Sequence, residues 1–186
     1  LREVGTTNQT NLSDYEEAIT EQTALLLKVH QSNFAIAGFT QSVDTRELKT
    51  LTQKCKIPLV VDQGSGAFLL TRQFSLEQEP MVQDIIRSGA DLVCFSADKL
   101  LGGPQGGIIC GKKEYTSRIR KDPLYRTYRV GKMTLSLLQS VLLCYLQGRT
   151  LQDLPLWRMI SLSSEEIKKR CQSLARRLRK EGIPAS

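Results

Sequence analysis

A single lysine lies between a short apolar run and a glycine-rich turn in "FSADKLLGGPQGG", residues 95–107. An amine at the mouth of an apolar strand is partly removed from water, and it loses its proton more readily there. Its lone pair can then attack a carbonyl carbon and form a Schiff base. The sequence therefore makes Lys99 a candidate for covalent chemistry.

A carboxylate ends the preceding apolar run, because "PLVVD" closes on Asp62 and is followed by "QGSG", residues 63–66. Ligands bind beyond the carboxyl ends of the strands in an open parallel sheet, so both segments are expected to face one cleft. An ionised aspartate keeps a pyridinium nitrogen protonated, and pyridoxal phosphate needs such a carboxylate together with a lysine. Lys99 in a plain surface turn remains the alternative. A Walker-type phosphate loop is excluded because the lysine precedes the glycines.

Hydrophobic runs alternate with helical patterns along the chain. The patterns predict strands within 23–29, 34–40, 58–62, 91–96 and 106–111, and helices from Ser13 onward and over 44–54, 79–89, 112–120, 132–147 and 163–181. Gly89 is expected to cap the third of these helices. This alternation indicates an α/β fold, a mostly parallel sheet with flanking helices. Residues 1–149 are predicted to belong to one domain, and 150–186 to begin a smaller one.

The composition favours anionic partners, since 26 Lys and Arg residues against 19 Asp and Glu give a net charge of +7. Seven basic residues fall within 168–180, and the simpler interpretation of that segment is the solvated face of an amphipathic helix. Five scattered cysteines without a CxxC pair indicate neither a zinc site nor a disulfide framework. No apolar run is long enough for a bilayer and Leu1 does not open a basic, apolar leader, so we expect a soluble, cytoplasmic protein.

Several separated segments carry a family resemblance: "REVGTTNQT", "LLLKVHQSNFAIAGFT", "VVDQGSG", "ADLVCFSADKLLGGPQGGIICGKKE", "DPLYRTYRVGKMTL" and "LPLWRMIS". They resemble the bacterial selenocysteine synthases, or L-seryl-tRNA(Sec) selenium transferases, which are fold type I enzymes dependent on pyridoxal phosphate. The resemblance implies conversion of seryl-tRNA(Sec) to selenocysteinyl-tRNA(Sec) through an aminoacrylyl intermediate. It implies selenophosphate as the donor and a homo-oligomeric full-length protein. It also implies a fragment that lacks the N-terminal region and the end of the C-terminal domain.

The resemblance also assigns roles around the lysine. Lys99 is implied to bind the cofactor covalently, and Asp62 to partner the pyridine nitrogen. Ser96 is implied to reach the cofactor phosphate, and Asp98 to act as an acid or base. Ser65, in the turn after Asp62, joins the residues expected to bind the cofactor.

Further positions are implied to face the cofactor or the substrates. His30 is expected near the cofactor, with Ser32 and Asn33 toward the substrate. Arg126 and Arg129, in "YRTYR", would share one face if that segment is helical, and they are implied to hold the selenium donor. No metal site is expected. A related lyase for a phosphorylated amino sugar or amino acid, or a non-catalytic binding fragment, remains the alternative.

Overall fold

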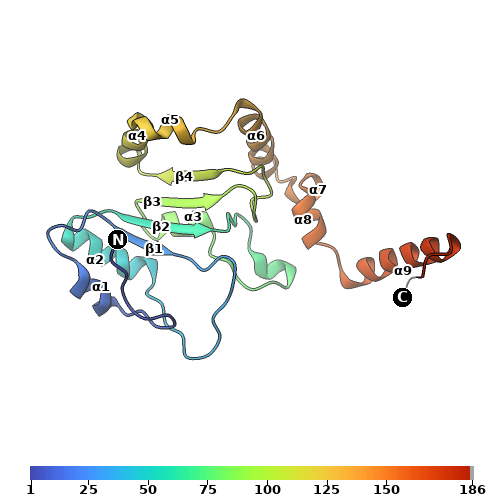
Figure 1. The fold of residues 1–186 in the computed structure, drawn as a ribbon, viewed down its shortest axis with the longest axis horizontal. Helices are drawn as coiled ribbons and strands as arrows, with labels where there is room; N and C mark the ends of the chain where they lie inside the picture. The colour runs from blue at the N-terminus through green and yellow to red at the C-terminus, as the bar shows by residue number, and fades with distance from the viewer. Residues whose placement is uncertain (185–186) are drawn as a thin grey trace. The chain divides into compact units, whose positions relative to one another are not determined.

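The computed structural model describes residues 1–184 and contains a four-stranded sheet. The strands are β1 (Leu26–Val29), β2 (Leu59–Gly64), β3 (Leu92–Ser96) and β4 (Gly107–Gly111), and they lie side by side in chain order (Figure 1). β1 pairs parallel to β2 and β2 parallel to β3, whereas β4 runs antiparallel to β3. The predicted mostly parallel sheet is confirmed.

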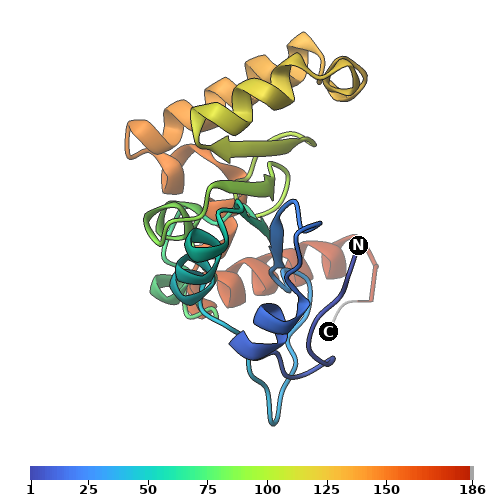
Figure 2. The ribbon, with the colours of Figure 1, turned by 90° about the vertical axis from the view of Figure 1, so that its left-hand side faces the viewer.

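Helices connect and flank the strands (Figure 2). Their bounds are α1 Leu12–Ala18, α2 Thr45–Cys55, the 3-10 helix η1 Thr71–Phe74, α3 Val82–Arg87, α4 Lys113–Lys121, α5 Pro123–Tyr128, α6 Lys132–Leu146, α7 Thr150–Asp153, α8 Pro155–Ile160 and α9 Ser164–Lys180. Within residues 1–184, no helix is both long enough and apolar enough to cross a membrane. The α/β class predicted from the sequence is confirmed.

The core forms where α2 and α3 pack against β2 and β3. α2 begins at a capping box in which Arg46 N donates to Asp44 Oδ1 over 2.7 Å and Asp44 N donates to Glu47 Oε2 over 3.1 Å. The apolar side chains buried from these four elements are Leu48, Leu51, Leu59, Val60, Val61, Val82, Ile85, Leu92, Val93 and Phe95. Their burial fixes the strands whose carboxyl ends carry the candidate site residues.

Residues 34–40 form no strand of the described sheet, so the predicted strand there is wrong. Phe34 and Phe39 are exposed, and the segment bonds with residues 8–10 instead. Asn8 Nδ2 donates to the Phe39 carbonyl over 2.8 Å, and Gln41 N donates to the Asn8 carbonyl over 3.0 Å. The apolar pattern predicted a strand, but these side chains do not enter the core of the described chain.

Two helix starts differ from the prediction. α1 is capped by Asn11, whose N–H donates to Asp14 Oδ2 over 2.7 Å, rather than by Ser13. α3 starts only at Val82, because buried Thr71 bonds the preceding segment, accepting from Glu79 N over 2.9 Å and donating to the Glu77 carbonyl over 2.6 Å. At the other end of α3 the cap is Ser88, and the predicted cap Gly89 follows it with φ of 99°.

The chain forms two compact units, Leu1–Val141 and a second that begins at Leu142. Three described residues of the second unit are buried: Thr150, Leu154 and Trp157. Trp157 Nε1 donates to Tyr145 Oη over 2.7 Å, and burial raises the pKa of Tyr145 to about 12. The assignment of residues 1–149 and 150–186 to a large and a small domain stays a prediction.

A buried carboxylate joins β3, α2 and β4 at the amino end of β3. The Asp91 side chain is 3% exposed and accepts from Lys49 Nζ over 2.8 Å, Lys112 Nζ over 2.6 Å and Leu59 N over 2.8 Å. Burial alone would raise the pKa of Asp91, but the hydrogen bonds from Lys112, Lys49 and Leu59 N outweigh it and lower that pKa below its ordinary value of 3.8. Asp91 therefore stabilises the fold in its ionised form.

Asp91→Ala is expected to lower the free energy of unfolding by about 3–5 kcal/mol, because it leaves the buried Lys49 ammonium without its counter-ion. Asp84→Ala, which breaks the exposed pair with Arg87, is the matched control and should cost less than about 1 kcal/mol. In the wild type, the Asp91 contribution is complete above the unfolded-state pKa and is lost as pH falls through the lower folded-state pKa. Urea unfolding of both variants across acidic pH measures this, and equal losses would contradict the assignment.

Candidate active site

Lys99 lies in a loop, residues 97–106, that the structure holds at several points. Ala97 N donates to the Gly106 carbonyl over 2.8 Å, closing the loop at its base. Leu100 N donates to the Ser65 carbonyl over 2.8 Å, which ties the loop to the turn after β2. Leu101 is fully buried and anchors the chain just beyond the lysine. The glycine-rich turn is thus a fixed support rather than a free surface loop.

The Lys99 ammonium reaches the segment that follows β1. Its Nζ donates to Ser32 Oγ over 3.1 Å and to Asn33 Oδ1 over 3.0 Å. Ser32 N donates to the His30 carbonyl over 3.0 Å, so the end of β1 sets the position of these partners. The structure therefore brings together Lys99, Ser32 and Asn33, three of the residues predicted to bind the cofactor or substrate.

Asp62 lies beside this group, near the carboxyl end of β2. A Cβ built on Gly64 would lie 2.6 Å from Ser32 Oγ and 3.9 Å from Asp62 Oδ1. The side chains of Ser32 and Asp62 thus lie next to Gly64. Only glycine, which has no side chain, leaves the space between them and the backbone open. We name Lys99, Ser32, Asn33, Asp62 and Gly64 the Lys99 cluster.

Gly64→Ala is expected to disturb the cluster, since Gly64 has φ of 71° and its new methyl group would push against Ser32. The left-handed backbone alone costs an alanine about 1–2 kcal/mol. In the complete protein we expect that loss in thermal unfolding together with weaker cofactor retention. Gly131→Ala is the control, because a Cβ there meets nothing within 4 Å. Equal thermal stability and equal cofactor retention in the two variants would contradict the tight fit at Gly64.

Two further side chains share the sheet face of Asp62. Cys94 pairs directly with Asp62 in the β2–β3 register, and Ser96, two residues later on β3, points the same way. Burial raises the pKa of the Cys94 thiol, and the negative charge of Asp62 and the neighbouring Cys110 add to the effect. The thiol therefore stays protonated at neutral pH and does not compete with the lysine as a nucleophile.

Ser65 is buried, and its hydroxyl bonds the Gln63 side chain. Gln63 was not singled out from the sequence, yet it is fully buried and organises this turn. Its Nε2 also donates to the Pro80 carbonyl over 3.0 Å, and its Oε1 accepts from Gly66 N over 2.6 Å. The glycine pair in "QGSG" marked the turn, but nothing in the sequence distinguished Gln63 from an exposed loop residue.

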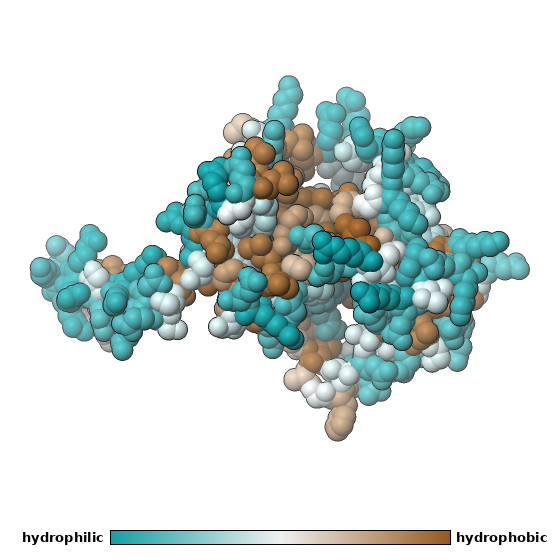
Figure 3. Space-filling model, turned by 180° about the vertical axis from the view of Figure 1, so that it is seen from behind, coloured by the Kyte–Doolittle hydropathy of each residue, from teal (hydrophilic) through white to brown (hydrophobic). Residues whose placement is uncertain are grey.

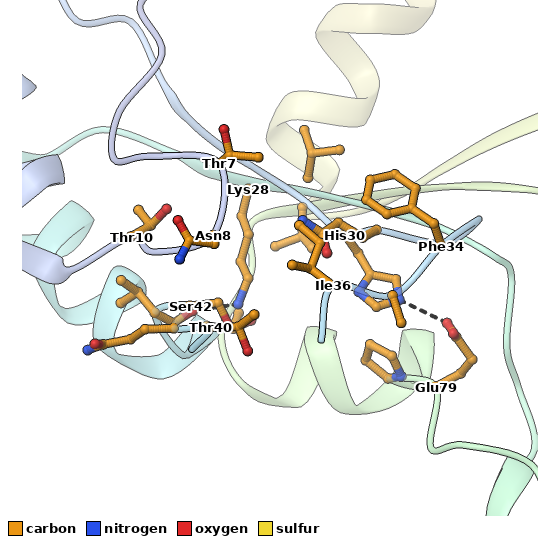
Figure 4. A pocket seen from close by; sticks show the side chains of 18 of the residues that line it. Thr7, Asn8, Thr10, Lys28, His30, Phe34, Ile36, Thr40, Ser42 and Glu79 are labelled. Atoms are coloured by element: carbon orange, nitrogen blue, oxygen red, sulfur yellow. Dashed lines mark hydrogen bonds and ion pairs between the residues drawn. The ribbon is translucent and has the colours of Figure 1, made fainter. Parts of the chain in front are cut away.

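His30 points into a separate pocket of about 600 Å³ (Figure 4). Its Nε2 lies 2.9 Å from Glu79 Oε2, and Lys28 lines the same pocket. Burial lowers the pKa of Lys28, although Asp44 and Glu47 oppose this, and its Nζ donates to the Val43 carbonyl over 2.5 Å. In the sheet register Lys28 pairs with Val61, so its side chain lies on the face opposite to that of Asp62.

Neither Lys99 nor Asp62 lines this pocket. His30 instead meets the Lys99 cluster through its backbone. Its N–H donates to the Asp62 carbonyl over 2.8 Å, and its carbonyl accepts from Ser32 N. The structure thus places the backbone of His30, but not its imidazole, between two members of the cluster.

Arg126 and Arg129 are both exposed, and they do not share a helical face. Arg126 lies in the last turn of α5, whereas Arg129 is the cap that follows, with an extended backbone at φ −67° and ψ 123°. The chain beyond Arg129 returns to the lysine loop, because a Cβ on Gly106 would lie 3.7 Å from Val130 Cγ1. The helical spacing predicted for the pair is wrong, but the segment adjoins the loop that carries Lys99.

Asp98 is exposed, next to the lysine. Among residues 1–184, no group of three or more His, Cys, Asp or Glu side chains could hold a metal ion. The polar groups gathered at this end of the sheet are therefore an amine, a carboxylate, hydroxyls and an amide. Such a set suits the binding of an organic cofactor.

Two solved structures illustrate the shared architecture. D-Glucosaminate-6-phosphate ammonia-lyase superposes with a TM-score of 0.67 at 23% identity, over 94% of this chain and 41% of that one. Aspartate aminotransferase from Thermotoga maritima gives 0.52 at 14% identity, over 95% and 42%. At these identities the likeness shows the fold alone.

Sequence comparison is more specific. The family model described as SelA, L-seryl-tRNA selenium transferase, matches residues 1–184. Proteins named L-seryl-tRNA(Sec) selenium transferase are 47% identical over 185 residues in Carboxydothermus hydrogenoformans and 50% identical over 182 residues in Maridesulfovibrio salexigens. These matches cover 100% and 97% of this chain but 40% and 39% of the relatives, so the chain spans about two fifths of their length. The chain belongs to the L-seryl-tRNA selenium transferase family.

Proposed function

We propose that the protein containing this chain converts seryl-tRNA(Sec) to selenocysteinyl-tRNA(Sec), with pyridoxal phosphate bound at Lys99. The observation that carries the proposal is the Lys99 cluster. The Lys99 amine donates to Ser32 and Asn33, and Ser32 and the Asp62 carboxylate both flank Gly64, at the carboxyl ends of parallel strands. The names of the similar proteins supply the substrate.

The residues present fit pyridoxal phosphate. When bound, this cofactor supplies an electron sink that stabilises a carbanion at the α-carbon of the amino acid. Asp62 would hold the ring nitrogen in its protonated form, and Lys99 would carry the group covalently. Gly64 keeps the space beside Ser32 and Asp62 free of a further side chain.

The neighbours of Lys99 prepare its amine. Ser32 and Asn33 accept hydrogen bonds from its Nζ over 3.1 and 3.0 Å and so fix the position of the amine. Both would also bind the seryl group of the substrate. Asp98, exposed beside Lys99, would move a proton at the substrate. Ser96, on the same sheet face as Asp62, would donate to the cofactor phosphate.

Ser65 and His30 would act on the cofactor site through the backbone. The Ser65 carbonyl accepts from Leu100 N and fixes the residue after the lysine. The backbone of His30 bonds Asp62 on one side and Ser32 on the other. Both residues are therefore positioning groups, with side chains engaged by Gln63 and Glu79 respectively.

Arg126 and Arg129 would hold selenophosphate, because guanidinium groups bind phosphate oxyanions in a bidentate manner. Their exposure leaves both groups accessible to a donor that must enter and leave, and Val130 connects them to the lysine loop. The full-length protein would work as a homo-oligomer. All five cysteines are free, which agrees with the reducing cytoplasm.

The proposal is tested by incubating the complete protein with seryl-tRNA(Sec), selenophosphate and pyridoxal phosphate, and by analysing the amino acid released from the tRNA. Selenocysteine is the expected product. D-Glucosaminate 6-phosphate, the substrate in the name of the structural neighbour, is the comparison substrate. Ammonia release from it, without selenocysteine on the tRNA, would overturn the proposal in favour of a small-molecule lyase.

A further inference from the structure

α9 concentrates the positive charge of the chain. It carries seven Lys and Arg residues and two Glu residues, so it contributes five of the seven net positive charges. Every one of these basic residues is exposed, and the surface of α9 is mostly hydrophilic in Figure 3. A concentration of positive charge on one helix attracts polyanions.

The helix separates its charges from its apolar side chains. Ile167, Leu174 and Leu178 are spaced seven and four residues apart and therefore form one stripe. Lys169, Arg176 and Lys180 repeat the same spacing two residues later, which places them about 200° around the helix axis. The basic row thus lies directly opposite the apolar stripe. α9 is about 25 Å long at the usual rise per residue, so the row is extended.

The two acidic residues of α9 lie in its first turn, and their ion pair with the row is at its first member, Lys169. Glu166 closes the capping box, accepting from Ser163 N over 2.9 Å, and Glu165 lies 4.0 Å from Lys169 at the first turns. In residues 1–184, Arg176 and Lys180 form no ion pair with a carboxylate. The charged residues in the last two turns of α9 are all basic.

The apolar stripe argues against a membrane as the anionic partner. Helices that lie on membranes use a broad apolar face, commonly with Trp, Phe and Leu. α9 has no aromatic residue, and its stripe consists of only three side chains along 17 residues. Such a narrow stripe suits packing against protein, and this leaves the opposite, basic row toward solvent.

We propose that the basic row of α9, Lys169, Arg176 and Lys180, binds the phosphate backbone of the tRNA substrate. This inference rests on the proposed function, which supplies the RNA. Phosphate contacts of this kind give affinity and orientation without reading sequence. Each contact releases counter-ions, so the binding constant must fall as salt rises, with a slope that counts the contacts.

The test uses the complete protein with fluorescently labelled, unacylated tRNA(Sec) transcript, titrated by anisotropy from low to physiological salt. Lys169→Ala/Arg176→Ala/Lys180→Ala is expected to weaken binding about 10- to 100-fold and to reduce the salt slope by about 2–3. One control keeps the charge, Lys169→Arg/Arg176→Lys/Lys180→Arg, and should bind like wild type. A second removes three exposed cations of α4, Lys113→Ala/Arg118→Ala/Lys121→Ala, and should lose much less affinity.

The outcomes separate this inference from the proposed function. If the wild type binds the tRNA and the α9 variant binds equally well, only the role of α9 is overturned. Equal losses in the α9 and α4 variants would also overturn it, because they would indicate diffuse attraction. If the wild type itself does not bind, the proposed function fails as well. Loss of binding to phosphatidylserine vesicles with tRNA binding intact would assign α9 to a membrane and overturn the inference.

Discussion

Lys99→Ala is expected to lower turnover of seryl-tRNA(Sec) in the complete protein by a factor of at least about 10³, because no other amine lies in the Lys99 cluster to carry the cofactor. The fold should survive. Lys99 is half-buried, and its two side-chain bonds, to Ser32 and Asn33, are replaceable by water. We expect the free energy of unfolding to change by less than about 1 kcal/mol.

Lys99→Arg is the matched control for charge. The guanidinium keeps the positive charge beside Ser32 and Asn33 but does not form the covalent link, so this variant should be as inactive as the alanine variant. Single-turnover assays and thermal unfolding of both variants measure the two effects separately. Near wild-type turnover in either variant would remove Lys99 from the chemistry.

Arg126→Ala and Arg129→Ala are expected to raise the KM for selenophosphate by about 10- to 100-fold each. A hydrogen bond to a charged group contributes about 1.5–3 kcal/mol, and about 1.4 kcal/mol corresponds to a factor of ten. The earlier half-reaction, loss of the seryl hydroxyl as water, does not use the donor. Its rate should therefore change less than about threefold.

Arg118→Ala, an exposed arginine of α4, controls for the loss of one surface charge and should leave both half-reactions unchanged. The two half-reactions are measured with and without selenophosphate on the same preparation. Equal impairment of both in the Arg126 or Arg129 variant would show that these arginines do not act on the donor.

Much of the fold follows from local patterns in the sequence. The runs that became β2, β3 and β4 are short, apolar and bounded by glycine or polar residues. The capping box at Ser163 fixed the start of α9. Residues 34–40 have the same apolar character but form no strand. Strand formation also requires a neighbouring strand edge and burial, and neither can be inferred from composition.

The candidate site was less predictable than the fold. Lys99 was singled out because it follows a strand end, whereas Ser32 and Asn33 were implied by the family resemblance. A parallel sheet brings strand ends together, and the three side chains do meet. His30 also follows a strand end, yet its imidazole turns to Glu79 because side chains alternate between the two faces of the sheet. The side of the sheet on which a side chain lies depends on the pairing register of its strand. That register becomes known only when the paired strands are seen. Gln63 and Gly64 act through close packing that no short motif encodes.

The most direct test of the account is borohydride reduction of the complete protein after incubation with pyridoxal phosphate, followed by peptide mass mapping. We predict a pyridoxyl group on the peptide that contains Lys99, and its absence from the same peptide of the Lys99→Arg variant. A folded wild-type protein that carries no adduct on Lys99, or carries it on another lysine, would contradict the assignment of this cluster as the cofactor site.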